Sequence, residues 1–293
     1  MKTAFEQPDG RVKWKKYQDL PGFSGDRKLE DRQKFIESDF KGKTVLDLGC
    51  WGGQMMLESK RLGAKKVLGV EIDKDAINIG RSLGLDIMVD DLENPFLWKE
   101  LPRFDVILCL AILGNMKNQV AVLSNASQLA DTMYVEGHGE QHKFSRSDWV
   151  NMFLTYTTYK TIEYLGNITT RPFFRLSREE KNLEYIKSKN YKRIAIIGKP
   201  GAGKTHYSKY FENYKIITDK ENVDFSGDMV VVDNHGALKL SEYDCVINIV
   251  SDKRLDNISN RENRPVDNQI IGFCDTVSPQ YLKGNYDFYT INN

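Results

Sequence analysis

The sequence predicts a two-domain α/β protein with a mostly parallel sheet in each domain. Three observations support this fold class. The chain has 293 residues, and single hydrophobic cores stop growing at roughly 250 to 300 residues. Apolar runs rich in β-branched residues alternate with longer amphipathic stretches, which is typical of a parallel sheet flanked by helices. This alternation restarts at Arg193, which indicates a second domain.

The composition is that of an ordinary globular protein, with 40% hydrophobic and 28% charged residues. A formal net charge of +1 gives no overall positive field, so nucleic acid is not the expected partner. The four cysteines are far apart and lack CxxC spacing. No signal-peptide region is visible, and no apolar run approaches the roughly 18 residues of a membrane span. We expect a cytoplasmic protein with reduced thiols and no membrane association, whose oligomeric state the sequence does not predict.

Five strands are expected in the first domain, with helix-length segments between them: Thr44–Leu48, Lys66–Glu71, Asp86–Val89, Phe104–Leu108 and Thr132–Glu136. Two further strands, Thr161–Leu165 and Pro172–Leu176, surround a turn at Gly166 and Asn167 and predict a closing antiparallel hairpin. The charged segment that follows has a serine able to cap a helix, early acids and late lysines, so a connecting helix is expected. The predicted domains are therefore residues 1–177 and 191–293, joined by a linker helix at 178–190.

A glycine-rich turn after the first of these strands is the first motif that indicates chemistry. VLDLGCWGG, residues 45–53, leads from a strand into a helix-like segment. Such a turn lets the backbone approach a ligand closely and directs helix N-terminal N–H groups toward it. Glu71 stands 22 residues after Gly49, at the end of the next strand. A carboxylate there can accept hydrogen bonds from both hydroxyls of a ribose, so the site predicts a nucleoside-bearing cofactor.

Over roughly residues 30–176 the sequence resembles the class I S-adenosylmethionine-dependent methyltransferases. The resemblance implies a Rossmann-like sheet with S-adenosylmethionine as cofactor, and the reversed last strand of the hairpin favours methyl transfer over hydride transfer. Trp51 stands where the family has the central glycine of the turn. The implied cofactor-binding residues are Asp47, Gly49 and Gly53 on the methionine side, Glu71 at the ribose, Ile72 against the adenine, and Asp90 or Asp91 near the adenine amino group.

The methyl acceptor is not identified by the sequence. The fourth strand lacks the Asp/Asn-Pro-Pro-aromatic motif of amino-methylating DNA enzymes, and no Pro-Cys pair suggests cytosine C5 methylation. Small-molecule, sugar, nucleotide and RNA acceptors remain open. A basic and aromatic segment at residues 11–17 is expected to act as a lid over the acceptor pocket.

Acid–base groups follow the fifth strand in YVEGHGEQH. Among Glu136, His138, Glu140 and His142, we predict catalytic roles for Glu136 and His138, with the histidine taking a proton from the acceptor. A surface loop with incidental histidines is the alternative. The spacing of His138 and His142 does not favour a metal site, because the glycines between them disfavour a helix.

GKPGAGKT, residues 198–205, is the strongest motif in the chain. It matches G-x-x-x-x-G-K-[ST], follows the apolar run IAII and precedes a helix-like segment. Such a phosphate-binding loop (P-loop) surrounds phosphates with backbone N–H groups, places its lysine beside the β- and γ-phosphates and ligates Mg²⁺ through its Ser/Thr hydroxyl. The sequence therefore predicts a site for ATP or another nucleoside triphosphate built by Gly198, Gly201, Gly203, Lys204 and Thr205.

Further strands of this domain are expected in KIIT, MVVVD, CVINIV and IIGFCD. Asp233 ends the second of them and is predicted to reach Mg²⁺ as a second metal-site residue beside Thr205. Asp219 could face a phosphoryl acceptor, and Lys253, Arg254, Arg261 and Arg264 could neutralise a transferring phosphoryl group. Over residues 192 to about 285 the domain resembles the P-loop kinases related to nucleotide and polynucleotide kinases, which implies catalytic roles for Lys204 and Asp233.

These observations predict a bifunctional enzyme that transfers a methyl group from S-adenosylmethionine and a phosphoryl group from ATP, with a small molecule, sugar or nucleotide as acceptor. Two alternatives remain open at this point. The second domain could be a nucleotide-binding module that regulates or assembles a methyltransferase without phosphorylating anything. The chain could also be an RNA-modifying methyltransferase joined to a polynucleotide kinase, although its near-neutral charge argues against this.

Overall fold

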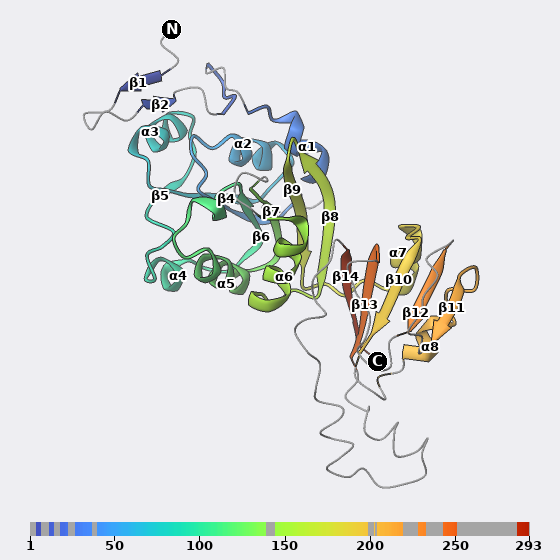
Figure 1. Cartoon of the computed structure of the whole chain (residues 1–293). Coiled ribbons are helices and arrows are strands. Elements are labelled where there is room, and N and C mark those ends of the chain that lie inside the picture. The colour runs from blue at the N-terminus through green and yellow to red at the C-terminus, as the bar shows by residue number, and fades with distance from the viewer. Residues whose placement is uncertain are drawn as a thin grey trace. The chain divides into compact units, whose positions relative to one another are not determined.

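The computed structural model describes residues 4–6, 12–14, 18–22, 27–36, 40–138, 144–198, 202, 204–218, 228–232, 243–250 and 286–292. The chain divides into two compact units (Figure 1). The N-terminal unit comprises Met1–His142 and Leu165–Phe174, and the C-terminal unit comprises Lys143–Tyr164 and Arg175–Asn293. In the described ranges, no helix is long and apolar enough to cross a membrane.

The N-terminal unit is built on five parallel strands, which confirm the predicted ones to within two residues. They are β3 (Thr44–Leu48), β4 (Lys66–Glu71), β5 (Ile87–Val89), β6 (Phe104–Leu110) and β7 (Ala130–Glu136). Their order is β7-β6-β3-β4-β5. This mixed α/β, Rossmann-like arrangement brings the carboxyl ends of the strands to one edge, where open α/β sheets bind their ligands.

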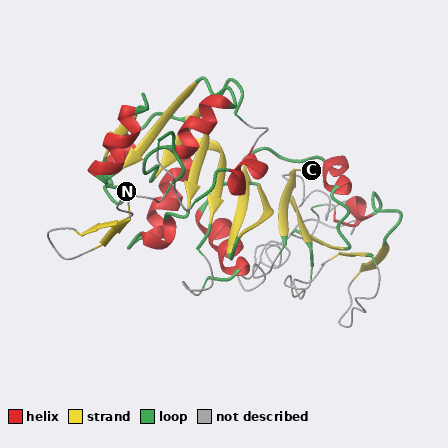
Figure 2. Ribbon diagram, turned by 90° about the horizontal axis from the view of Figure 1, so that it is seen from above, coloured by secondary structure: helices red, strands yellow, loops and turns green. Residues whose placement is uncertain are grey.

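Helices connect these parallel strands, and Figure 2 shows them flanking the strands of this unit. They are α2 (Gln54–Arg61), α3 (Lys74–Ser82), α4 (Leu97–Glu100), the short 3₁₀ helix η1 (Leu113–Asn115) and α5 (Gln119–Leu129). Asp73 caps α3, because its carboxylate accepts hydrogen bonds from the backbone N–H groups of Asp75 and Ala76. Before β3 lie the antiparallel pair β1 (Ala4–Glu6) and β2 (Val12–Trp14) and the helix α1 (Glu30–Ile36).

The hairpin strands are β8 (Thr161–Ile168) and β9 (Arg171–Ser177), which neighbour each other in the sheet order. The predicted turn at Gly166 and Asn167 is wrong, because both residues belong to β8 and the chain turns at Thr169 and Thr170 instead. A Cβ atom on Gly166 would lie 3.2 Å from the Phe35 ring. The glycine therefore permits a close approach to α1 and does not serve the turn.

Aromatic rings join α1, β7 and β9 in the core of the N-terminal unit. Phe35 stacks on Phe173 with ring centroids 5.0 Å apart, and Tyr134 lies 6.2 Å from both Phe40 and Phe173. Phe40, Tyr134 and Phe173 are completely or almost completely buried. Cys50, Cys109 and Cys245 are buried free thiols.

The C-terminal unit contains a second parallel sheet, ordered β11-β12-β10-β13-β14. Its elements are α6 (Arg146–Tyr156), α7 (Leu183–Ser188), β10 (Arg193–Ile197), α8 (Lys204–Ser208), β11 (Lys215–Thr218), β12 (Met229–Val232), β13 (Cys245–Val250) and β14 (Asp287–Asn292). The sequence did not predict β14, which also pairs antiparallel with the start of β8. The strand predicted in IIGFCD lies outside the described residues.

The two compact units differ from the predicted domain ranges. Helix α6 and residues up to Tyr164 group with the C-terminal unit, and the predicted linker helix is limited to α7, which Asn182 caps through the backbone N–H of Tyr185. A polar network within this unit explains the grouping, because Arg146 on α6 lies 3.5 Å from Asp287 on β14.

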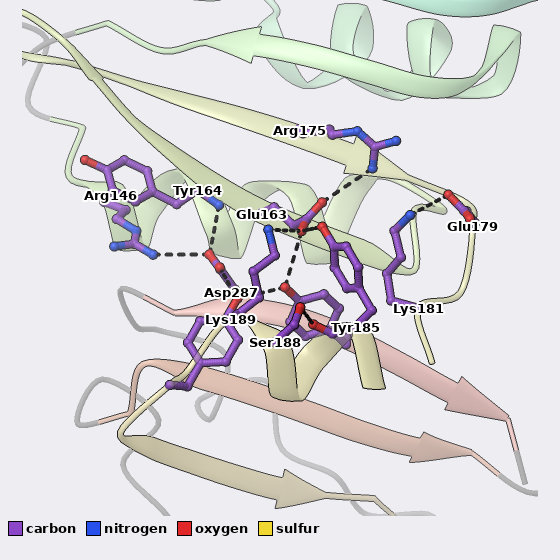
Figure 3. A network of polar contacts seen from close by, with 12 residues as sticks. Arg146, Glu163, Tyr164, Arg175, Glu179, Lys181, Tyr185, Ser188, Lys189 and Asp287 are labelled. Carbon is purple, nitrogen blue, oxygen red and sulfur yellow. Dashed lines mark hydrogen bonds and ion pairs between the residues drawn. The ribbon is translucent and has the colours of Figure 1, made fainter. Parts of the chain in front are cut away.

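The network has two carboxylates at its centre, Glu163 and Asp287 (Figure 3). Asp287 accepts hydrogen bonds from the Tyr164 N–H at 2.8 Å and the Tyr191 hydroxyl at 2.5 Å. Burial raises the pKa of Asp287, while these two hydrogen bonds oppose the rise. Glu163 accepts a hydrogen bond from the Tyr185 hydroxyl at 2.5 Å and lies within 3.5 Å of Arg175 and Lys189. These bonds tie β14 to β8, and β8 to β9 and α7.

Replacing Phe173 with alanine should strongly destabilise the N-terminal unit. Truncating a buried phenylalanine costs about 3–5 kcal/mol, since it removes apolar burial and leaves a cavity. Thermal unfolding should therefore show a clearly lower midpoint for Phe173→Ala. Phe96→Ala is the matched control, because 65% of Phe96 is exposed, and its midpoint should match that of the wild type. Equal midpoints for the two variants would contradict this description of the core.

Candidate functional site

A cavity of about 190 Å³ opens at the carboxyl ends of the central strands of the N-terminal unit. Its walls come from the ends of β3, β4 and β6, from α2 and from the segment before β3. The lining residues are Gln18, Arg32, Asp47, Gly49, Trp51, Met55, Glu71, Leu110, Ala111, Ile112 and Asn115. The structure thus brings together three of the predicted cofactor-binding residues, Asp47, Gly49 and Glu71.

The turn after β3 contacts the side chain of Glu71. Trp51 adopts a left-handed conformation with φ 50°, and its backbone N–H donates a hydrogen bond to Glu71 Oε2 at 2.9 Å. Left-handed backbone is uncommon for a residue other than glycine, so this bond compensates strain in the turn. Gly53 ends the turn at φ 88° and precedes α2 directly. Trp51 thus occupies the position where the family has the central glycine of the turn, and it forms part of the cavity wall.

Glu71 is held by backbone groups on both carboxylate oxygens. Its Oε1 accepts hydrogen bonds from the N–H groups of Ile72 at 2.8 Å and Asp73 at 2.9 Å, in addition to the bond from Trp51 to Oε2. A carboxylate offers about four acceptor positions, so these three bonds leave one on Oε2. In this conformation Glu71 can accept a hydrogen bond from one ribose hydroxyl, whereas the sequence predicted hydrogen bonds from both.

The predicted adenine-side residues follow β4 and β5. Ile72 is 60% exposed, which leaves an apolar surface beside Glu71 for a flat ring. The N–H of Asp90 donates to the carbonyl oxygen of Glu71 at 3.1 Å, and Asp90 Oδ1 accepts a hydrogen bond from Asn94 at 2.9 Å. Asp91 is exposed and caps the turn by accepting a hydrogen bond from the Glu93 N–H. Asp90 therefore lies directly beside the end of β4.

Asp47 is almost completely buried near the end of β3, in the wall of the cavity. Burial raises the pKa of its carboxyl group to about 7, while Arg32 opposes the rise and Glu71 adds to it. Arg32 and Gln18, which the sequence did not predict as site residues, line the cavity from the segment before β3. Gln18 accepts a hydrogen bond from the Gln54 N–H at 3.0 Å and donates one to the carbonyl oxygen of Cys50 at 3.2 Å, so it fixes both ends of the turn.

Glu136 ends β7 and is fully buried in a cluster of arginines. Arg32 donates to Glu136 Oε2 through Nε at 2.8 Å and has a terminal nitrogen 2.7 Å from it, and Arg171 donates to Oε1 at 2.7 Å. A terminal nitrogen of Arg27 lies 3.8 Å from Oε1. These bonds occupy the carboxylate, so the geometry favours a positioning role for Glu136 over the predicted catalytic one.

His138 follows β7 by two residues and is 7% exposed. A Cβ atom on Gly114 would lie 2.4 Å from its ring, so the imidazole packs directly against the backbone of η1. The adjacent Gly137 N–H donates to the carbonyl oxygen of Pro172 at 2.8 Å and fixes the start of this loop. Glu140 and His142 lie outside the described residues.

The P-loop segment belongs to the C-terminal unit. The structure places β10 before it and α8 after it, in the predicted order. Lys204 is 5% exposed, and its Nζ donates to the carbonyl oxygen of Gly198 at 2.8 Å, while Thr205 is exposed. No group of three or more His, Cys, Asp or Glu residues is arranged to hold a metal in the part of the chain that is described. Predicted residues outside that part are Gly201, Gly203, Asp219, Asp233, Lys253, Arg254, Arg261 and Arg264.

The N-terminal part of the chain is similar to known methyltransferases. Residues 24–165 match the family described as "Methyltransferase domain". The chain is 33% identical over 87 residues to the ribosomal protein L11 methyltransferase of Colwellia psychrerythraea, covering 29% of this chain and 30% of that protein. It is 31% identical over 106 residues to the ubiquinone biosynthesis O-methyltransferase of Coxiella burnetii, covering 33% of this chain and 44% of that protein. The chain therefore spans less than half the length of these relatives.

Two solved structures are also similar. The bifunctional kinase–methyltransferase WbdD gives a TM-score of 0.44 at 16% identity, covering 55% of this chain and 42% of that one. Magnesium protoporphyrin IX methyltransferase from Synechocystis PCC 6803 gives a TM-score of 0.41 at 16% identity, covering 49% of this chain and 73% of that one. The family match and the curated relatives support a class I S-adenosylmethionine-dependent methyltransferase domain within residues 24–165.

Proposed function

We propose that the chain is a bifunctional enzyme that methylates a small-molecule or nucleotide acceptor and transfers a phosphoryl group from ATP. The observation that carries the methyltransferase part is the cavity of the N-terminal unit, which Glu71, Asp47 and Arg32 line together. These groups suit the two ends of S-adenosylmethionine. The ribose needs a hydrogen-bond acceptor, and the methionine end carries an ammonium and a carboxylate.

The strand order sets the orientation of the cofactor in this proposal. Glu71 ends β4, Ile72 follows it and Asp90 follows β5, so the adenosine lies over that half of the sheet. Asp90 is preferred over Asp91 as the partner of the adenine amino group, because its N–H is bonded to Glu71. Asp47 is the penultimate residue of β3, and Arg32 lines the same cavity, so the carboxyl would face the ammonium of the methionine end and the guanidinium would face its carboxylate.

The methyl acceptor then lies toward β6 and β7, where His138 is. S-adenosylmethionine would supply an activated methyl group to an oxygen or nitrogen of the acceptor. The imidazole of His138 would take the proton that this atom loses. The close packing of the ring against Gly114 supports this role, since it holds the imidazole in one position.

The phosphoryl-transfer part rests on GKPGAGKT in its strand–loop–helix context. Lys204 bonds to the carbonyl oxygen of Gly198, which keeps its ammonium at the start of the loop where the phosphates of a nucleotide bind. Thr205 on α8 and Asp233 would hold Mg²⁺. A nucleotide-binding module without phosphoryl transfer is the second candidate function.

The affinity for S-adenosylhomocysteine should rise with pH. The Asp47 carboxyl has its pKa raised to about 7, so it is mostly protonated below that pH, whereas the ligand's ammonium favours the ionised form. The Kd should fall up to about tenfold per pH unit between pH 5.5 and 7 and level off above. Calorimetric titration from pH 5.5 to 8 measures this. Asp47→Asn should bind more weakly without the pH dependence, while exposed Asp131→Asn should behave as the wild type. A flat wild-type profile would exclude this role.

Removing the proposed base should slow methyl transfer without weakening cofactor binding. We expect His138→Gln to lower kcat by roughly 10²–10⁴-fold, the usual contribution of a general base, and to leave the Kd for S-adenosylhomocysteine unchanged. Transfer of labelled methyl groups into a metabolite extract measures the rate. His206→Gln is the control, because His206 is exposed and belongs to the other unit. Full activity of His138→Gln would assign proton removal to another group.

Lys204→Met should weaken Mg·ATP binding and abolish the phosphorylated product while methylation continues. The charge of Lys204 is the one that a P-loop directs at the β- and γ-phosphates. Calorimetry with Mg·ATP and mass spectrometry of an incubated extract test this, with exposed Lys209→Met as control. Loss of methylation from Lys204→Met, with no phosphorylated product from the wild type, would instead support the regulatory module.

A further inference from the structure

In the turn at residues 49–53, one side chain contributes to the wall of the ligand cavity. The three glycines of this turn are closely covered, because an added Cβ atom would lie within 2.6 Å of a neighbouring side chain at each of them. Cys50 is buried in the core of the unit. Trp51 is only partly buried and lines the cavity. Trp51 is therefore the residue of this turn whose side chain can contact a ligand.

The backbone of Trp51 is strained in a way that a glycine would relieve. Its φ of 50° lies in the left-handed region, which is unfavourable for a residue with a Cβ atom. Glycine adopts this conformation readily. Residues that are held in such conformations cluster at ligand-binding and catalytic sites. The strain and the position in the cavity wall together indicate a function for the indole side chain.

Trp51 lies next to the group that is proposed to bind the ribose. Its N–H donates to Glu71 Oε2 at 2.9 Å. Asp47 and Arg32, which are proposed to bind the amino-acid end of the cofactor, line the same cavity. In S-adenosylmethionine the sulfonium joins the ribose to the amino-acid end. A ligand that fills a cavity of about 190 Å³ contacts the side chains that line it, so the indole is within reach of this part of the cofactor.

The acids of the cavity are assigned to other parts of the cofactor. Among the described lining residues these acids are Asp47 and Glu71. Glu71 accepts three backbone hydrogen bonds, and its remaining acceptor position is proposed for the ribose. Asp47 is proposed to face the ammonium, and Arg32 adds a positive charge to the same wall. These assignments leave the sulfonium without a carboxylate partner among the described lining residues.

An indole ring can stabilise such a cation. The face of an aromatic ring carries negative electrostatic potential and attracts a cation that lies within about 6 Å of the ring centre, and tryptophan gives the strongest attraction. Trp51 is the aromatic side chain among the described lining residues. S-adenosylhomocysteine has a neutral thioether where S-adenosylmethionine has the sulfonium. A contact between the ring face and the sulfonium therefore favours the cofactor over the product.

We infer that Trp51 is a specificity-determining residue whose indole face binds the sulfonium of S-adenosylmethionine and so distinguishes this cofactor from S-adenosylhomocysteine. This inference rests on the proposed methyltransferase function. Its consequence is weaker inhibition by the product, which lacks the cation that the ring attracts. The alternative is that the ring packs only on the adenosine or only closes the wall of the cavity.

Three ligands that differ in charge at the reacting centre test the inference by calorimetric titration. S-adenosylmethionine has a sulfonium there, sinefungin has an ammonium group, and S-adenosylhomocysteine is neutral. Trp51→Gly should weaken the binding of the two cations by about 2- to 30-fold more than that of S-adenosylhomocysteine. The ammonium and carboxylate of the amino-acid end are the same in all three ligands, so their contribution cancels in this comparison.

The other outcomes separate the inference from the proposed function. An equal loss of affinity for all three ligands would place the ring on the adenosine, and unchanged affinities would give it no part in binding. Either result would overturn the inference and leave the methyltransferase function intact. A wild-type protein that binds none of the three ligands would overturn both.

Two further variants separate the electrostatic effect of the ring from its bulk. Trp51→Phe keeps an aromatic face and should retain part of the preference for the cations. Trp51→Leu keeps an apolar side chain without that face and should lose the preference as fully as Trp51→Gly. Wild-type preference in a folded Trp51→Leu protein would overturn the inference.

Trp98→Leu is the matched control. Trp98 belongs to the same unit, does not line the cavity and donates through its indole N–H to the carbonyl oxygen of Leu92 at 3.2 Å. Its replacement should leave the ratio of the three Kd values unchanged. Thermal unfolding of each variant verifies that it is folded before its affinities are compared.

Discussion

The buried ion pair between Arg32 and Glu136 links the parts of the N-terminal unit on which the site depends. Arg32 belongs to α1, and Glu136 ends β7 more than a hundred residues later. The pair holds α1 beside the cavity, and Arg171 joins the start of β9 to the same carboxylate. Removing one member of a buried pair costs about 3–5 kcal/mol, because the other charge is left uncompensated. A site that contains such a pair therefore depends on both the N-terminal segment and the hairpin.

Because the strands are parallel, different groups lie at the carboxyl ends of different strands. Groups that follow β4 and β5 form an apolar and acceptor-rich surface suited to adenosine, whereas the end of β3 provides Asp47. The ends of β6 and β7 carry η1, His138 and the arginine cluster. The C-terminal unit has its own parallel sheet, which the carboxylates Glu163 and Asp287 connect to the first residues of β8 and to α7 (Figure 3).

Local sequence patterns were sufficient to predict the strands of the first sheet, the turn at residues 49–53 and the position of Glu71 at the end of β4. Strand periodicity and glycine spacing are properties of neighbouring residues. Other features depend on contacts that are distant in sequence. Glycine and asparagine at 166 and 167 suggested a turn, but the approach of Phe35 to Gly166 explains that glycine. The arginine partners of Glu136 could not be predicted from the residues next to it in the sequence. The basic residues around Arg27 and Arg32 were the one sequence feature that pointed to them. The strand β14 was missed because it lies apart from the alternating pattern that precedes it.

A crystal structure of the chain with S-adenosylhomocysteine would test the proposed cofactor site. We expect the ligand to fill the cavity, with a ribose hydroxyl on Oε2 of Glu71, the adenine against Ile72, and the amino-acid end between Asp47 and Arg32. The homocysteine sulfur should then face the side of β6 and β7. An empty cavity at saturating ligand, or a ligand bound in the reverse direction along the sheet, would contradict the account.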